Sequence, residues 1–202
     1  VDHEQVGLYM ADVAGHGVSA ALISGLLKMA VTSLRERAAE GEPETAQPGR
    51  VLARLNDLLL REIPDCEFIT MVYAVLDLRS NSVTVASAGH PPPFVIHRVN
   101  GAASAWRLPN GAALGLLPDQ AYEAVRQILG PGDSLVFYTD GLIEAMSAEG
   151  EEFGEERALD VVARHAAAAP GELLQALRDA VDQHRAGAAV SDDFSLLVCS
   201  FE

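Results

Sequence analysis

Apolar residues form two kinds of pattern along the chain, and together these patterns predict an α+β protein. Short runs of strand length, bounded mostly by Gly, Pro, Asp or Asn, occur at 6–11, 68–76, 83–88, 94–97, 124–129, 134–138 and 194–201. Apolar residues at helical spacing occupy 18–39, 50–63, 157–168 and 172–183. The turn Arg-Ser-Asn-Ser at 79–82 predicts a hairpin, whereas 100–122 is rich in turn residues and predicts no clear element.

The same patterning predicts how deeply three segments are buried. Residues 6–11 are apolar on both faces, which is typical of a strand covered on both sides. The helix that begins at Val18 carries charged side chains mainly near its end, so we expect its first turns to be buried. The acidic segment 149–156 is expected to be a solvated surface loop.

Length, charge and cysteine content narrow the class of protein. A chain of 202 residues with 49% apolar residues can form the core of one domain. Its formal charge of −15 argues against nucleic acid or an anionic membrane as a partner, since both bind clustered Lys and Arg. Cys66 and Cys199 have no metal-binding or redox spacing, and no stretch of about 18 uncharged apolar residues is present. We therefore expect a cytoplasmic domain without direct membrane contact.

Acidic residues stand at three ends of predicted strands. Asp12 follows the first strand, Asp140 follows the strand at 134–138, and Asp192 and Asp193 precede the last strand. Each alone is compatible with an ordinary turn, because Asp is common beside Gly. Three carboxylates at one edge would repel one another unless a cation held them, and ligands made only of oxygen suit Mg²⁺ or Mn²⁺. A centre with two such ions about 4 Å apart, acting on a phosphoryl group, explains all three positions.

A glycine-rich turn with Gly15 and Gly17 follows Asp12. Two other kinds of functional site contain such a turn, but the rest of this sequence fits both of them less well. Residues 15–20 match the dinucleotide-binding pattern G-x-G-x-x-A, but no second strand with a terminal acid follows the first helix, and Asp12 would repel a pyrophosphate. The segment around Ser19 is similar to a nucleophile elbow, but its second glycine is missing.

Several motifs occur in order along nearly the whole chain. They are ADVAGHGVSAAL at 11–22, SAGHPPP at 87–93, LGL at 114–116, PGDSLVFYTDGLIEA at 131–145, FG at 153–154 and SDDFSLLV at 191–198. Together they resemble the bacterial RsbU/SpoIIE-like branch of the metal-dependent (PPM-type) serine/threonine protein phosphatases. The resemblance implies a central antiparallel β-sandwich flanked by α-helices on both faces, in four αββα layers, with two Mn²⁺ or Mg²⁺ ions at one end.

The resemblance also implies the metal ligands. By this resemblance Asp12 bridges both ions, and the backbone carbonyl of Val13 completes the coordination of one of them. Asp140 and Asp192 hold the other ion. These carboxylates act through metal-activated water. Asp193 supports the site, and a shift of one position would make it the ligand in place of Asp192.

Two histidines have weaker claims to the site. In relatives with an Asp-Gly-His-Gly turn, the histidine two residues after the aspartate has been considered as a general acid. In this chain His16 lies four residues after Asp12. His90 lies in a proline-rich loop, and we expect it to be structural.

The implied activity is hydrolysis of phosphoserine or phosphothreonine on a regulatory protein in bacterial stress or developmental signalling. The implied substrate is a phosphorylated anti-sigma-factor antagonist of the STAS type. Family members carry a Gly-Gly-Asp motif on an earlier strand that this chain lacks, so we expect 1–202 to be a single phosphatase domain truncated at its N-terminus. The parent protein would then carry an upstream sensor or receiver domain. The alternative is a catalytically silent module that keeps the phosphatase shape and binds a signalling protein.

Overall fold

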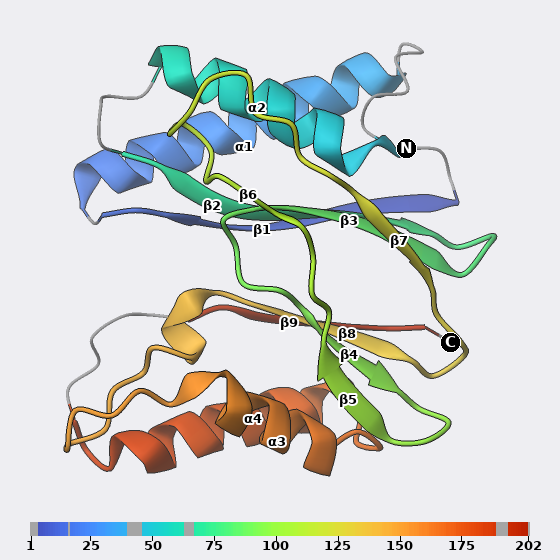
Figure 1. Cartoon of the computed structure of the whole chain (residues 1–202), viewed down its shortest axis with the longest axis vertical. Coiled ribbons are helices and arrows are strands. Elements are labelled where there is room, and N and C mark those ends of the chain that lie inside the picture. The colour runs from blue at the N-terminus through green and yellow to red at the C-terminus, as the bar shows by residue number, and fades with distance from the viewer. Residues whose placement is uncertain (1–3, 16, 40–45, 63–66, 189–193, 202) are drawn as a thin grey trace. The chain divides into compact units, whose positions relative to one another are not determined.

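The structure is a computed structural model that describes residues 4–15, 17–39, 46–62, 67–188 and 194–201 (Figure 1). The chain divides into two compact units. The first unit comprises Val1–His90 and Leu108–Ile128, and the second comprises Pro91–Arg107 and Leu129–Glu202. Each unit has its own sheet, helices and hydrophobic core, so the predicted α+β class is confirmed. No described helix has the length and apolar character needed to cross a membrane.

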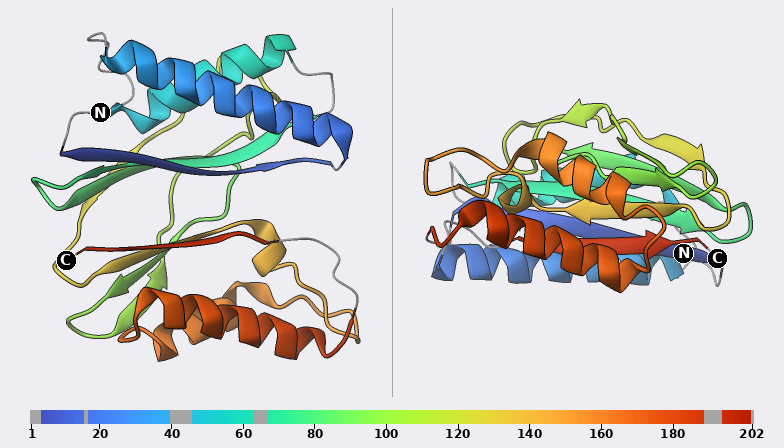
Figure 2. Two further views of the ribbon diagram at one scale, coloured as in Figure 1. Left: turned by 180° about the vertical axis from the view of Figure 1, so that it is seen from behind. Right: turned by 90° about the horizontal axis from the view of Figure 1, so that it is seen from below.

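The first unit is built on a sheet with the strand order β1-β2-β3-β6, in which β7 also pairs with β3. All pairs are antiparallel except β3 with β6, which is parallel. The helices of this unit lie together on one side of the sheet (Figure 2). The elements are β1 (Gln5–Val13), α1 (Val18–Ala39), α2 (Pro48–Glu62), β2 (Ile69–Asp77), β3 (Ser82–Ala88), β6 (Asn110–Gly111) and β7 (Val125–Ile128).

The core of the first unit lies between α2 and one face of the sheet. Leu52 and Leu59 of α2 are fully buried, and they share a cluster with Met71 of β2. Asn56 is the buried polar residue of α2, and both ends of its amide are used. Its Nδ2 donates to the carbonyl of Leu117 at 2.9 Å, and its Oδ1 accepts the Gly115 N–H at 3.0 Å. This pair of hydrogen bonds ties the loop after β6 to α2.

Two burial predictions for the first unit are wrong. Within the described strands β1 forms the edge of its sheet, and its Val6 is 47% exposed. In the first turns of α1, Val18 and Leu22 are 78% and 70% exposed. Apolar character marks a surface as buried only where another element packs on it, and the side of α1 that joins the core carries Ile23, Leu27 and Ala30.

The second unit is built on an antiparallel sheet with the strand order β5-β4-β8-β9. Its core joins the sheet to the helices, and within it the rings of Phe94 and Tyr138 stack with centroids 4.7 Å apart. The elements are β4 (Phe94–His97), β5 (Ala102–Ala105), β8 (Ser134–Tyr138), the 3₁₀ turn η2 (Asp140–Leu142), α3 (Gly154–Arg164), α4 (Pro170–Arg185) and β9 (Leu196–Ser200).

Most element positions match the sequence patterns, and the differences have local causes. α4 begins at Pro170, which the sequence pattern placed in the linker, because a proline is well suited to the first helical position, where no N–H partner is needed. α3 ends at Arg164, before the predicted end at 168. The segment 100–122 contains β5 and β6, which are short and carry no β-branched or aromatic residue.

Candidate metal centre

Asp12 lies at the end of β1, where the edge strand leaves the sheet. It is half-buried, and in the ladder it lies directly opposite Thr70 of β2. Val13 pairs with Ile69, and the N–H of Ala14 donates to the carbonyl of Phe68 at 2.9 Å. The chain then turns through Gly15, whose φ of +103° is readily adopted only by glycine. Asp12 therefore lies on a paired strand, three positions before a glycine with positive φ.

The strands beside Asp12 also position a buried histidine. His90 is 3% exposed, and its Nδ1 lies 2.9 Å from the Oγ1 of Thr70. The hydroxyl of Ser87 accepts the His90 N–H at 3.2 Å and donates to the His90 carbonyl at 3.0 Å. These contacts agree with the structural role expected for His90. They also bring it, through Thr70, close to the predicted ligand Asp12.

Asp140 is placed by a different local structure. It follows β8, which lies between β4 and β9, and it begins η2. Its carbonyl accepts the N–H groups of Ile143 and Glu144, both at 2.9 Å. The preceding Thr139 fixes the strand end, since its Oγ1 accepts the Ser195 N–H at 2.9 Å and its own N–H donates to the Ser195 carbonyl at 3.2 Å. The backbone of Asp140 is thus held from both sides.

The predicted convergence of the carboxylates stays a prediction. Asp12 belongs to the first unit and Asp140 to the second. Three other candidates, His16, Asp192 and Asp193, lie outside the described residues. Within the residues that the structure describes, no three His, Cys, Asp or Glu side chains form a group that could hold a metal ion. The donors that are described fit Mg²⁺ or Mn²⁺ by their chemistry, because the Asp12 and Asp140 carboxylates and the Val13 carbonyl offer only oxygen.

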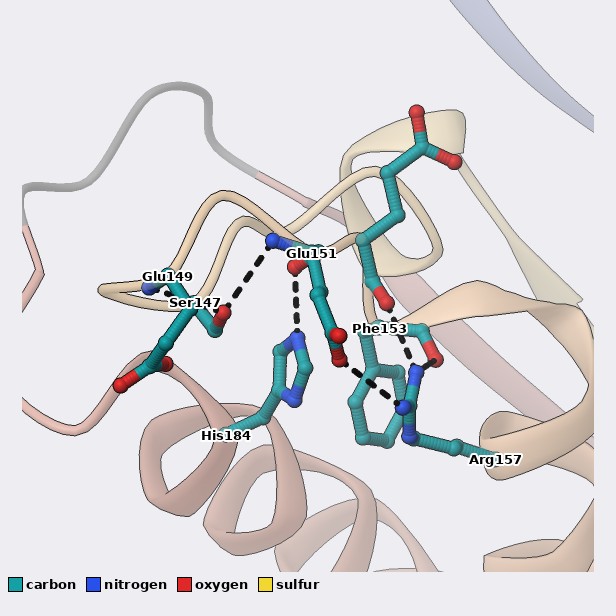
Figure 3. Close-up of polar contacts among 7 residues, drawn as sticks. Ser147, Glu149, Glu151, Phe153, Arg157 and His184 are labelled. Atoms are coloured by element: carbon teal, nitrogen blue, oxygen red, sulfur yellow. Dashed lines mark hydrogen bonds and ion pairs between the residues drawn. The ribbon is translucent and has the colours of Figure 1, made fainter.

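The acidic segment after η2 is more ordered than the sequence analysis expected (Figure 3). Glu149, Glu151 and Glu152 are exposed, as expected for a solvated loop. The backbone of the segment, however, is held by side chains from three places in the chain. The hydroxyl of Ser147 accepts the N–H groups of Glu149 and Glu151 at 3.2 Å each, and a ring nitrogen of His184 lies 2.9 Å from the Glu151 carbonyl. Arg157 donates to the carbonyls of Glu152 at 2.8 Å and Phe153 at 3.0 Å.

Sequence reasoning missed the roles of Thr70 and His184. Neither lies in a motif used for the prediction, and each reaches its partner across a long stretch of chain. For Thr70, a usable signal was available in principle, since pairing the strands 6–11 and 68–76 as neighbours places it near Asp12. No local signal points to His184, because its partner lies 33 positions away.

Comparison with known proteins places this geometry in a family. The model of the family "Stage II sporulation protein E (SpoIIE)" matches residues 2–202. The phosphoserine phosphatase RsbU of Bacillus subtilis is 31% identical over 199 residues, which are 98% of this chain and 56% of RsbU. The chain thus spans about half of that relative, and it spans 22% of the protein IcfG of Synechocystis, to which it is 28% identical over 144 residues.

Solved structures show the same fold. The SiaA-PP2C domain of Pseudomonas aeruginosa superposes with a TM-score of 0.80 at 20% identity, covering 98% of this chain and 81% of that one. The RsbU and RsbW domains of Rv1364c from Mycobacterium tuberculosis give a TM-score of 0.76 at 25% identity, over 96% and 51% of the two chains. RsbX, which has been solved in complex with magnesium, gives 0.63 at 17% identity, over 98% and 82%. The fold is therefore that of PP2C phosphatases, and the chain belongs to the SpoIIE family.

Proposed function

We propose that this chain is the catalytic domain of a metal-dependent protein phosphatase that hydrolyses phosphoserine or phosphothreonine. The observation that carries the proposal is the match of the SpoIIE family to 2–202, together with an aspartate at the end of a strand in each unit. The relative RsbU, 31% identical, is named a phosphoserine phosphatase. An acidic chain whose candidate ligands are all oxygen atoms suits a divalent cation and excludes a zinc–thiolate centre.

In the proposed mechanism, Asp12, the Val13 carbonyl, Asp140 and Asp192 would hold two Mn²⁺ or Mg²⁺ ions, and Asp193 would support the site. When bound, such ions polarise a phosphoryl oxygen and lower the pKa of water, so that no protein nucleophile is required. β1 and the turn at Gly15 present Asp12, while η2 holds the backbone of Asp140. The hydroxyl of Ser19 has no place in this mechanism, because its partner is Glu67 Oε1 at 2.6 Å.

The substrate and setting are part of the same proposal. We propose a phosphorylated anti-sigma-factor antagonist of the STAS type as substrate, and a sensor or receiver domain upstream in the parent protein. The likeness to RsbU and to the RsbU and RsbW domains of Rv1364c supports this choice. We propose the cytoplasm as the location, in keeping with Cys199, which is a free thiol, and with the absence of a disulfide-type cysteine pattern.

The experiment that tests the function measures phosphate release from a phosphoserine peptide with and without Mn²⁺. The 202-residue chain is compared with a version extended upstream by about 30 residues, enough for several additional strands of average length. We expect release that depends on Mn²⁺ and that EDTA abolishes. If the extended version neither binds Mn²⁺ nor releases phosphate, the phosphatase is excluded. The catalytically silent binding module then takes its place.

A further inference from the structure

The side chains next to Asp12 lie on one face of the sheet of the first unit. Residues directly opposite each other in an antiparallel ladder project from the same face, with Cβ atoms about 5 Å apart. Thr70 is opposite Asp12, so the two side chains are neighbours on one face. The residues on either side of Thr70, Ile69 and Met71, belong instead to the core with the helices. Asp12 and Thr70 therefore lie on the face that the helices of this unit do not cover.

The strand that carries Asp12 has a hydrogen-bonded neighbouring strand on one side. In the described part of the sheet, β1 pairs with β2 alone. Two positions beyond Asp12, the chain passes into the turn that contains Gly15. Thr70 is the β2 residue directly opposite Asp12, and it is therefore the β2 side chain closest to the carboxylate.

The side chain of Thr70 is in turn held by His90. The His90 ring is buried, and its Nδ1 lies 2.9 Å from Thr70 Oγ1. The Ser87 hydroxyl fixes both the N–H and the carbonyl of His90. Gly89 allows this loop to pass close to Ala113, since its φ is +69° and an added Cβ would lie 3.1 Å from the Ala113 Cβ. The backbone of His90 is thus held in place, and its ring lies against Thr70.

A threonine hydroxyl can link a histidine to a carboxylate, because it accepts a hydrogen bond from one and donates a hydrogen bond to the other. A hydroxyl donates one hydrogen bond and accepts others, and a carboxylate has about four acceptor positions, so it can accept a hydrogen bond while it binds metal. If the His90 Nδ1–H donates to Thr70 Oγ1, the Thr70 proton is left to donate to a different acceptor. The acceptor that the ladder places on the same face is Asp12.

We propose that Thr70 and His90 are positioning residues for Asp12, with His90 Nδ1 donating to Thr70 and Thr70 donating to the Asp12 carboxylate. This inference rests on the proposed function, because it assigns the pair to the orientation of a metal ligand. Partners of this kind fix the geometry of the ligand, and their loss typically weakens metal binding or activity by about 10- to 100-fold.

The first test replaces Thr70 and measures Mn²⁺ affinity by calorimetry in the 202-residue chain, without substrate. Thr70→Val removes the hydroxyl and keeps the β-branched shape, and we expect Mn²⁺ binding to weaken by about 10- to 100-fold. Thr70→Ser keeps the hydroxyl and should bind Mn²⁺ as the unsubstituted chain does. Thr84→Val is the matched control, since Thr84 is also a half-buried strand threonine but lies on the opposite face of the same sheet. It should leave Mn²⁺ affinity unchanged.

The second test asks whether Thr70 and His90 act through one path. His90→Asn alone should weaken Mn²⁺ binding. The double variant with Thr70→Val should bind Mn²⁺ with the same affinity as Thr70→Val alone, because the histidine acts only through the threonine. Two independent structural effects would add instead. Far-UV circular dichroism checks that each variant is folded. If His90→Asn does not fold, the comparison of Thr70→Val with Thr70→Ser decides the proposal.

The outcomes separate this inference from the proposed function. If the unsubstituted chain binds Mn²⁺ and releases phosphate while Thr70→Val does so equally well, the positioning role is wrong and the phosphatase stands. Loss of Mn²⁺ affinity in Thr70→Ser equal to that in Thr70→Val would also overturn the role of the hydroxyl. If the unsubstituted chain binds no Mn²⁺, the same variants are compared in the version extended upstream, and if that version binds none either, both proposals fall.

Discussion

Asp12 in the first unit ends an edge strand and is followed by a glycine turn, whereas Asp140 in the second unit follows the interior strand β8. The backbone of Asp140 is held locally, by the hydrogen bonds of η2 and by those of the preceding residue Thr139. Asp12 is followed by Val13, which is still paired with β2, and Thr70, the residue opposite Asp12, contacts the ring of His90 from a different loop. The two aspartates thus differ in their surroundings: backbone hydrogen bonds in its own turn hold Asp140, whereas the residue opposite Asp12 contacts a side chain from elsewhere in the chain.

The largest effects are expected when either carboxylate is neutralised. Asp12→Asn and Asp140→Asn should each remove several kcal/mol of transition-state stabilisation, or on the order of 10³-fold in phosphate release. Ser19→Ala is the control and should be nearly silent, because Ser19 is bonded to Glu67. Release of phosphate from a phosphoserine peptide measures all three variants. An equal loss in Ser19→Ala would indicate a serine nucleophile and contradict the metal mechanism.

The next largest effects are expected from substitutions that create a similar cavity in each of the two cores. Leu52 of α2 and Leu177 of α4 are both fully buried, one in each unit. Leu52→Ala and Leu177→Ala should each lower the free energy of unfolding by about 2–5 kcal/mol. Trp106, the one tryptophan of the chain, lies in the second unit, so its fluorescence in urea reports that unit. We expect Leu177→Ala to shift the Trp106 midpoint more than Leu52→Ala does. Equal shifts would show that the two cores unfold as one.

A buried aspartate in the second unit, Asp133, and a half-buried one in the first, Asp77, should differ in how their contribution to stability depends on pH. Burial by itself raises the pKa of Asp133, but the N–H groups of Gly130 and Arg98 and the ring of His97 outweigh it and hold the pKa below its usual value. The pKa of Asp77, in the β2–β3 turn, is lowered chiefly by the Ser80 N–H. Because the folded pKa lies below the unfolded pKa of about 3.9, each stabilises the protein above that pH.

Asp133→Asn should therefore lower the free energy of unfolding at pH 7 by about 1–3 kcal/mol, since its amide cannot accept at both positions. The difference from the unsubstituted chain should shrink as the pH falls through the folded pKa, where the aspartate itself becomes protonated. Asp77→Asn, at an exposed turn, should have a smaller effect. Urea unfolding between pH 7 and pH 3 measures both. A constant difference over this range would rule out the carboxylate charge as the cause.

The smallest effects concern a pair of buried tyrosines, one in each core. Burial, with a contribution from Asp57, raises the pKa of Tyr122 to about 12, and burial also raises the pKa of Tyr138. Among the described residues, neither hydroxyl has a hydrogen-bond partner. Removing an unpartnered buried hydroxyl costs little, so Tyr122→Phe and Tyr138→Phe should change the free energy of unfolding by less than about 1 kcal/mol. A loss above 2 kcal/mol in thermal or urea unfolding would reveal a partner for that hydroxyl.

Local patterns in the sequence were sufficient for most elements of the fold. The predicted helix 18–39 and the predicted strand 134–138 have the bounds of α1 and β8. Hydrophobic periodicity is a property of neighbouring residues, so one sequence can reveal it. For the same reason the sequence placed Asp12 and Asp140 at the ends of strands, and in the structure Asp12 is the second-last residue of β1 while Asp140 lies two positions beyond β8. The short strands β5 and β6 were missed because their sequences, AASA and NG, contain none of the β-branched or aromatic residues that mark a strand.

The burial and the surroundings of these residues depend on tertiary structure. The sequence of β1 resembles that of a central strand, yet Val6 is exposed because the described sheet ends there. His90 meets Thr70 across 20 positions, and Thr70 faces Asp12 across 58. Such pairs are set by strand register and loop closure, which join distant parts of the chain, and a local pattern carries no information about them. The sequence by itself thus determined the elements and the candidate ligands, and only the tertiary structure decided which side chains lie beside Asp12.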